Sequence, residues 1–246
     1  MAKISAVIIT YNEEKNIERC LASLHTVCDE IIVLDSFSND KTVEICKIAG
    51  IMLYQHKWLG YAGAKNLANE KATHDWILSI AADAALSPGL ADSILKIKNN
   101  LSHKFYSFNR LTNYCGTWIK NSGWYPDTKI RLFDRQKAHW EGLIHEKLIY
   151  DMKIPIVNLK GDLYHYSYYT YEDHERQIKK YSTLAAEELK LKGKKSNIIK
   201  ELFFTASKFL ETYIFKKAFL DGAAGFKISV MTAKATRLKY QKLRKL

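Results

Sequence analysis

The sequence predicts an α/β protein with a mainly parallel sheet flanked by helices, followed by a basic helical extension. In the first hundred residues, short apolar runs alternate with helical patterns, which is typical of a parallel sheet with right-handed crossovers. Two of these apolar runs, residues 30–35 and 76–83, each end in an aspartate, Asp35 and Asp83. A carboxylate at the end of a buried strand indicates a ligand crevice above that edge of the sheet.

The expected elements follow in order along the chain. We expect strands at 4–10, 30–35, 51–54 and 76–80, and helices after Asn12, through 43–49, near 62–72 and from about Leu90. Asn12 is the expected N-cap of the first helix, since Glu13 and Glu14 would then suit the helix dipole.

After residue 104 the pattern changes. Strands are expected at 105–110 and 129–133, joined by a long loop at 114–127, and the aromatic-rich run 165–171 is interpreted as an ordinary half-buried strand. From residue 171 the pattern is helical, with breaks near Gly193 and at 222–225. We therefore expect a domain at 1–170, with halves 1–103 and 104–170, and a helical region at 171–246.

Bulk composition excludes several classes of protein. With 246 residues and 47% apolar composition, the chain is not disordered. The four cysteines lack C-x-x-C spacing and predict reduced thiols. No apolar run reaches the roughly 18 residues of a membrane span, and strand-like sequence at the N-terminus leaves no room for a signal peptide.

Positive charge is concentrated at one end of the chain. The formal net charge is +12, and residues 194–246 hold thirteen Lys or Arg against three acids, a net +10. Apolar residues mixed with these lysines favour attachment to an anionic membrane surface. A helical cap with solvated lysines is the alternative, and no nucleic-acid module accompanies the charge, so no nucleic-acid partner is expected.

Nucleotide-cofactor motifs do not occur in the chain. There is no G-x-G-x-x-G after the first strand and no G-x-x-x-x-G-K-[ST], which argues against dehydrogenases and P-loop proteins. The first strand ends instead in Thr10-Tyr11-Asn12-Glu13, which offers an aromatic face and polar groups to a flat heterocycle.

Three opening stretches and several later ones resemble a known family. Residues 7–13, 32–42 and 76–83 resemble the opening motifs of family 2 glycosyltransferases with the GT-A fold. Residues 60–68, 123–127, 131–133, 144–146 and 164–167 are similar to the bacterial branch that contains lipopolysaccharide core glucosyltransferases. The resemblance extends from about residue 3 to the C-terminus.

The resemblance implies inverting transfer of a sugar from a nucleotide diphosphate sugar, with Mg²⁺ or Mn²⁺ as the cofactor. The resemblance implies that contacts to the base and ribose are made by Thr10, Tyr11, Glu13, Asp35 and Ser36. It implies a contact to the base or the diphosphate for Lys65 and metal binding for Asp83. Such a cation prefers oxygen ligands and neutralises the departing diphosphate. The alternative for Asp35 and Asp83 is that both are N-caps or turn formers.

The metal motif departs from the family pattern. Where Asp-x-Asp is usual, this chain has Ala81-Ala82-Asp83, followed by Ala84. Weak metal binding, an altered donor, an inactive protein or an engineered substitution would each be consistent with that change.

Inverting transfer needs a base that accepts the proton of the acceptor hydroxyl, and a carboxylate serves this purpose. Glu146, in Ile144-His145-Glu146, is the first candidate and Asp127 the second. The alternative for Glu146 is a surface carboxylate paired with a neighbouring cation. Arg131 and His145 are candidates for binding the diphosphate.

Together these observations predict a cytoplasmic glycosyltransferase, peripheral on the inner face of the cytoplasmic membrane. It would move a hexose, glucose from UDP-glucose, to a lipid-linked oligosaccharide such as lipopolysaccharide core. A silent nucleotide-sugar or glycan-binding protein of the same fold is the alternative. A nucleotidyltransferase would require a Gly-rich basic loop after the first strand, which is absent.

Overall fold

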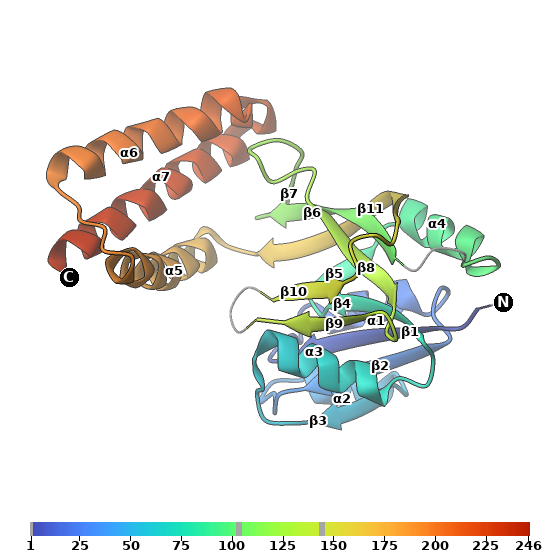
Figure 1. The fold of residues 1–246 in the computed structure, drawn as a ribbon. Helices are drawn as coiled ribbons and strands as arrows, with labels where there is room; N and C mark the ends of the chain where they lie inside the picture. The colour runs from blue at the N-terminus through green and yellow to red at the C-terminus, as the bar shows by residue number, and fades with distance from the viewer. Residues whose placement is uncertain (1, 102–104, 143–145) are drawn as a thin grey trace. The chain divides into compact units, whose positions relative to one another are not determined.

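The computed structural model describes residues 2–101, 105–142 and 146–246. The chain divides into two compact units: a first unit of residues 1–110 and 127–165, and a second unit of residues 111–126 and 166–246. The elements confirm the predicted α/β fold with its C-terminal helices (Figure 1). The assignment of separate roles to 1–170 and 171–246 stays a prediction.

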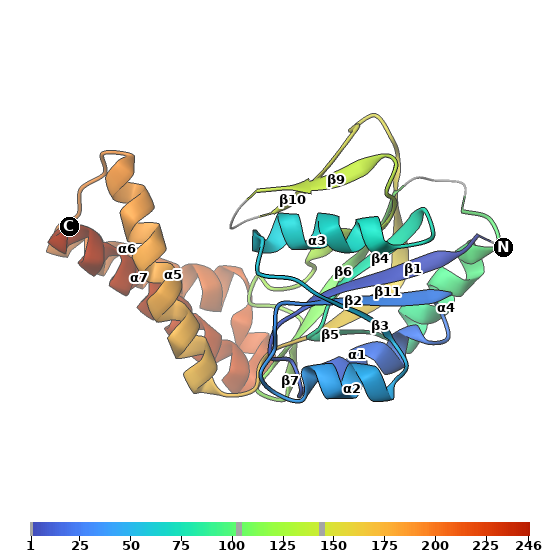
Figure 2. The same ribbon diagram turned by 90° about the horizontal axis from the view of Figure 1, so that it is seen from below.

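Four parallel strands form the first half of the sheet. They are β1 (Ile4–Thr10), β2 (Glu30–Asp35), β3 (Met52–Gln55) and β4 (Trp76–Ala81), in the order β3-β2-β1-β4. Helices α1 (Ile17–Leu24), α2 (Thr42–Ile48) and α3 (Gly60–Lys71) connect them. Because side chains alternate along a strand, Ile8 packs on the core that includes α1, whereas Val7 packs on the core that includes α3 (Figure 2).

Antiparallel strands extend the sheet beyond β4. The path continues through β8 (Thr128–Asp134), β6 (Phe105–Tyr114), β11 (Ile156–Tyr168) and β5 (Ala84–Leu86). Helix α4 (Pro88–Lys98) follows β5, and β9 (Ala138–Glu141) pairs with β10 (Lys147–Tyr150). In the β5–β11 pairing His165 lies opposite Ala84, so β11 passes directly beside the residue that follows Asp83.

Helices dominate the second unit, as predicted. It contains β7 (Thr117–Ile119), α5 (Tyr171–Leu191), α6 (Ile198–Leu210), the π-helical turn η1 (Glu211–Phe215), the 3₁₀ turn η2 (Ala218–Asp221) and α7 (Gly222–Lys245). A Cβ at Gly225 would lie 1.8 Å from the carbonyl oxygen of Ala218, so only glycine fits there. Within the described parts of the chain, no helix is both long and apolar enough to span a membrane.

The expected N-cap at Asn12 is wrong. Helix α1 begins at Ile17, after Asn16, and Asn12 adopts φ 55°. Its backbone N–H donates to Ser38 Oγ at 2.8 Å, and its Oδ1 accepts from the backbone N–H of Asn39 at 2.9 Å. Asn12 therefore joins the loops that follow β1 and β2, since Asn tolerates the left-handed conformation that this requires.

Candidate active site

The sheet register brings predicted residues together at one edge. Thr10 lies opposite Asp35 in the β1–β2 pair, and Ile9 lies opposite Ala81 in the β1–β4 pair. The carboxyl ends of β1, β2 and β4 therefore meet, with Asp83 two residues beyond the last. The backbone N–H of Ser36 donates to the carbonyl of Thr10 at 3.0 Å and holds the two loops together.

Asp35 is fully buried and already hydrogen bonded. Its Oδ2 accepts from the backbone N–H of Ser38 at 3.0 Å and from Nε2 of Gln55 at 2.9 Å, and its Oδ1 accepts from the Ser38 hydroxyl. This carboxylate fixes the loop after β2, in agreement with the turn-forming alternative. A direct contact of Asp35 with a nucleoside stays a prediction.

The loop after β1 presents two different kinds of group. Tyr11 is 55% exposed, which leaves its ring open to stacking. The Thr10 hydroxyl oxygen is buried, with no hydrogen-bond partner in the part of the chain that the structure describes. Burial raises the pKa of Glu13 to about 7, although its carboxylate accepts a hydrogen bond from Nδ2 of Asn16 at 2.7 Å.

Asp83 is paired with a residue that the sequence did not single out. Nε2 of His165, on β11, lies 3.1 Å from Asp83 Oδ2, and both side chains are mostly buried. Burial raises the pKa of Asp83, but the neighbouring charges of His165 and Arg110 outweigh it and hold the pKa below its ordinary value. The ionised carboxylate is therefore the stable form.

These two side chains fit a divalent cation that is completed by a ligand. Asp83 Oδ1 is buried and has no hydrogen-bond partner among the described residues. A carboxylate suits Mg²⁺ or Mn²⁺, an imidazole binds a metal in its neutral form, and such cations are commonly held by few protein groups plus substrate phosphates. Across residues 2–101, 105–142 and 146–246, no cluster of three or more His, Cys, Asp or Glu is placed to hold a metal by itself.

Lys65 and Glu146 form a mostly buried ion pair. Lys65 Nζ, on α3, lies 2.6 Å from Glu146 Oε1, just before β10. Lys65 Nζ also lies 4.2 Å from the ring centre of Trp140. The backbone of Trp140 forms hydrogen bonds of 2.8 and 2.9 Å with the side chain of Asn66. Helix α3 and strand β9 are thus held together beside the ammonium group.

The charge of each partner responds to this setting. Burial and the charge of Arg131 lower the pKa of Lys65 to about 8, against the opposing effect of Glu146. Burial raises the pKa of Glu146, but Lys65 and then Arg131 outweigh it, so the pKa lies below its ordinary value. Glu146 is therefore ionised, which a base requires.

Asp127, the second base candidate, is held by two cations. Arg110 Nη2 lies 2.6 Å from its Oδ2, and Lys129 Nζ lies 2.8 Å from its Oδ1. Burial raises the pKa of Asp127, but Lys129 and Arg110 lower it by more, so the pKa lies below its ordinary value. Because both oxygens are already paired, Asp127 is less suited than Glu146 to accept a proton.

Arg131 links these groups into one charged cluster. Its pKa is lowered, first by burial and then by Arg110, while the charges of Glu146, Asp127 and Asp83 act in the opposite direction. The first unit therefore gathers four cations and three carboxylates in one cluster: Lys65, Arg110, Lys129, Arg131, Asp83, Asp127 and Glu146. His145 lies outside the described residues.

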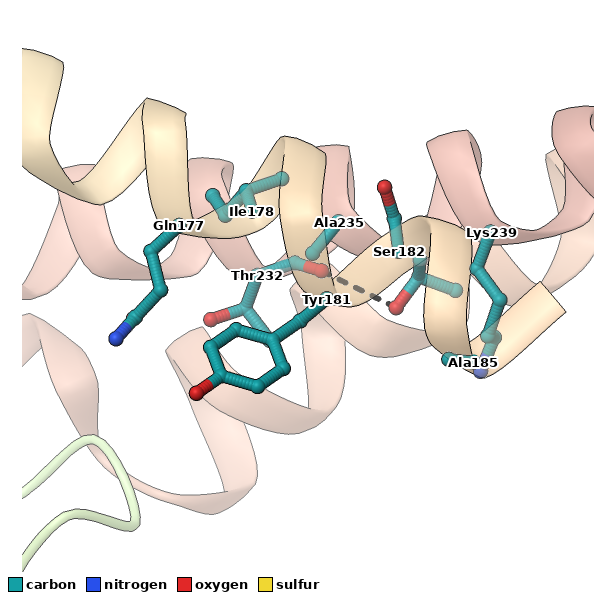
Figure 3. Close-up of a pocket in the computed structure, with 9 residues that line it drawn as sticks. Gln177, Ile178, Tyr181, Ser182, Ala185, Thr232, Ala235 and Lys239 are labelled. Carbon is teal, nitrogen blue, oxygen red and sulfur yellow. Dashed lines mark hydrogen bonds between the residues drawn. The ribbon is translucent and has the colours of Figure 1, made fainter. Parts of the chain in front are cut away.

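A groove in the second unit has a different character. It has a volume of about 260 Å³ and lies between α5 and α7, with Tyr181, Thr232 and Lys239 among its lining residues (Figure 3). None of the nine residues that line it is a carboxylate. The sequence-predicted site residues that the structure describes all lie in the first unit and none of them lines this groove.

Comparison with known sequences gives consistent results. The family model described as "Glycosyl transferase family 2" matches residues 5–154. An uncharacterized glycosyltransferase of Rickettsia typhi is 33% identical over 100% of this chain and 88% of its own length. The lipopolysaccharide core biosynthesis glycosyltransferase LpsC of Rhizobium meliloti is 27% identical over 93% of this chain and 87% of its own length.

Solved structures show weaker similarity. Glucosyl-3-phosphoglycerate synthase of Mycobacterium tuberculosis, in complex with Mn²⁺ and UDP-glucose, has a TM-score of 0.39 and 21% identity, over 46% of this chain and 44% of that one. TarS of S. aureus has a TM-score of 0.47 and 14% identity, over 74% of this chain and 39% of that one.

Proposed function

Since the chain belongs to glycosyltransferase family 2, we propose that it transfers glucose from UDP-glucose to a lipid-linked oligosaccharide, with inversion at the anomeric carbon. The observation that carries this proposal is the charged cluster around Arg131, beside the Asp83–His165 pair. The relative named as a lipopolysaccharide core glycosyltransferase supports core oligosaccharide as the acceptor.

The nucleoside is assigned to the loops after β1 and β2. The exposed ring of Tyr11 stacks on the base, while Thr10, Glu13 and Ser36 supply polar groups nearby. Asp35 acts by holding the second loop in place through its three hydrogen bonds, and a nucleoside hydroxyl can add to them.

The diphosphate is assigned to the cations of the cluster. Lys65 and Arg131 bind its oxygens, because charge-assisted hydrogen bonds to phosphate are strong in a partly buried site. Asp83 and His165 would hold a Mg²⁺ or Mn²⁺ ion, which when bound supplies Lewis-acid neutralisation of the leaving group.

Glu146 is the proposed base. Its ionised carboxylate accepts the proton of the acceptor hydroxyl, as that oxygen forms a bond to the anomeric carbon and the bond from this carbon to the diphosphate breaks. The ion pair with Lys65 keeps Glu146 ionised and fixes its position. When Lys65 turns to the diphosphate, that pair weakens and the basicity of Glu146 rises.

The acceptor's lipid anchor places the enzyme at a membrane surface, which the net charge of +10 in residues 194–246 favours. We therefore propose peripheral attachment to the inner face of the cytoplasmic membrane.

A silent nucleotide-sugar-binding protein is the second candidate, because Ala81 replaces a carboxylate of the family motif. Calorimetry with UDP, with and without Mn²⁺, followed by a UDP-glucose hydrolysis assay, separates the two. We expect metal-dependent UDP binding and slow donor hydrolysis. UDP affinity that is the same with and without Mn²⁺, together with UDP-glucose that stays intact after prolonged incubation, would instead identify the silent protein.

A further inference from the structure

Helix α6 has an apolar face that its own unit leaves uncovered. At 100° per residue, residues 198, 199, 202, 203, 206 and 210 share one side of the helix. The large apolar members of this side are strongly exposed: Ile198 58%, Ile199 77%, Leu202 56%, Phe203 64% and Leu210 46%. We call this side the outer α6 face; the 13 residues of the helix make it about 20 Å long.

The opposite side of α6 buries a charge. Glu201 is 3% exposed and faces α7, where Gln241 Nε2 donates to it at 2.8 Å and Arg237 and Arg244 lie 3.3 and 3.4 Å away. Figure 1 shows α6 and α7 running side by side. A helix in water normally turns its charges outward and its apolar residues inward, because burying a charge is costly. Helix α6 packs Phe204 on Tyr240 and Phe209 near Phe226 of α7, yet it also buries Glu201 on that side and leaves large apolar residues on the outer α6 face.

Exposed apolar residues continue beyond the helix. Four large side chains of the turns η1 and η2 are also exposed: Ile214 51%, Phe215 79%, Phe219 48% and Leu220 61%. Exposed large apolar side chains thus recur along the chain from the first turn of α6 to the residue before Asp221. Isolated apolar residues on a surface are ordinary, but a contiguous patch indicates an interaction site.

Lysines lie at two places along these exposed segments. Lys194, Lys195 and Lys200 are exposed at the start of α6, and Lys216 and Lys217 are exposed after η1. The nearby acid Glu211 is neutralised by Lys208 and Lys216, at 2.8 and 2.7 Å. Exposed apolar side chains with lysines before α6 and after η1 complement a bilayer surface with anionic headgroups, because such a helix buries its apolar face in the bilayer interface.

We propose that the outer α6 face inserts into the interface of an anionic lipid bilayer. The inference rests on the peripheral attachment proposed above and specifies its surface: apolar insertion by α6 and its following turns, with lysines binding headgroups on either side. A second copy of the chain is the competing occupant, which the experiment distinguishes.

The test is flotation of the full chain with vesicles of phosphatidylcholine alone or mixed with phosphatidylglycerol. The variant Leu202→Gln with Phe203→Gln removes two exposed apolar side chains from the face. Its matched control, Ile48→Gln with Met152→Gln, removes two that are 80% and 89% exposed in the first unit. We expect the wild type and the control to float with anionic vesicles and to stay partly bound in high salt, and the α6 variant to bind roughly tenfold less or weaker still.

Several results would overturn the proposal. Equal binding of the α6 variant and the control would assign attachment to charge alone, as would complete release of the wild type by salt. A wild-type dimer in light scattering that the α6 variant converts to a monomer, without vesicle binding, would assign the face to a second copy. UDP-glucose hydrolysis without vesicles should be equal in all three proteins, so its absence from all three would count against the catalytic proposal alone.

Discussion

The titration of Lys65 gives the sharpest test of the site. Its side chain is 10% exposed and is influenced by the charges of Arg131 and Arg110 as well as Glu146, and burial lowers its pKa to about 8. If Lys65 binds the diphosphate as a cation, donor affinity must fall as pH rises through this value. The replacements Lys65→Arg and Lys65→Met separate the charge from the rest of the side chain, since arginine stays protonated throughout.

The size of the effect follows from the fraction protonated. With a pKa of about 8, roughly nine-tenths of Lys65 is charged at about pH 7 and roughly one-tenth at about pH 9. If only the charged form binds the diphosphate, affinity falls about tenfold across this range, ~1.4 kcal/mol of binding free energy. The loss is expected as pH rises, because the favourable form of Lys65 is the protonated one.

Calorimetry with UDP-glucose across this pH range measures the effect. The wild type should lose affinity about tenfold, Lys65→Arg should show a much flatter profile, and Lys65→Met should bind weakly at every pH. Ionisation of the base in the ligand would appear equally in the wild type and Lys65→Arg, so it cancels in their comparison. A wild-type profile as flat as that of Lys65→Arg would refute the assignment of Lys65 to the diphosphate.

Three further predictions concern the carboxylates. Glu146→Gln should reduce transfer about 100- to 10,000-fold with UDP affinity nearly unchanged, whereas Asp127→Asn should retain more activity; the opposite order in a radiolabelled-sugar transfer assay would move the base to Asp127. Asp83→Asn should weaken the Mn²⁺-dependent part of UDP binding by roughly 10- to 100-fold or more, and calorimetry with and without Mn²⁺ that gives the wild-type difference would contradict the metal assignment. Ala81→Asp, at an exposed strand end, should strengthen this metal-dependent binding roughly tenfold, and unchanged titrations would show that position 81 does not face the ligand.

The parallel part of the fold was readable because local signals agreed with each other. Continuous apolar runs ending at Thr10, Asp35 and Ala81 became β1, β2 and β4, and their shared edge followed from the parallel pairing. The start of the first helix was not readable, since Asn12 satisfies the usual N-cap preference. Asn12 is instead held by hydrogen bonds to the loop after β2. That loop is distant in sequence, so local sequence patterns do not indicate the contact.

The predicted site was recovered in part. Lys65, Arg131 and Glu146, which the sequence singled out as candidate site residues, lie in one charged cluster, although their roles stay predictions. Arg110 and His165 were missed. His165 lies in the stretch 164–167 that resembles the family, but neither residue has a role assigned by a sequence pattern, and only contacts distant in sequence bring them to Asp127 and Asp83.

Helix α6 shows the same limit for a surface. The spacing of apolar residues from Ile198 to Leu210 predicts an amphipathic helix, but periodicity identifies two faces without saying which one is inside. Packing decided that question through Glu201, whose partners Arg237 and Arg244 lie on α7. Membrane attachment of the basic region and a helical cap with solvated lysines both stay predictions.

The two alanines of the altered metal motif have different structural positions. Ala84 is 3% exposed, packs in the core and lies opposite His165 in the sheet, where a carboxylate would be buried at high cost. Ala81 is exposed at the end of β4, where a carboxylate fits. Position 84 is thus closed to an acid by packing, whereas position 81 is not. Because His165 already stands beside Asp83, the change at position 81 leaves two candidate ligands in place, and the altered motif alone does not decide between an active and a silent protein.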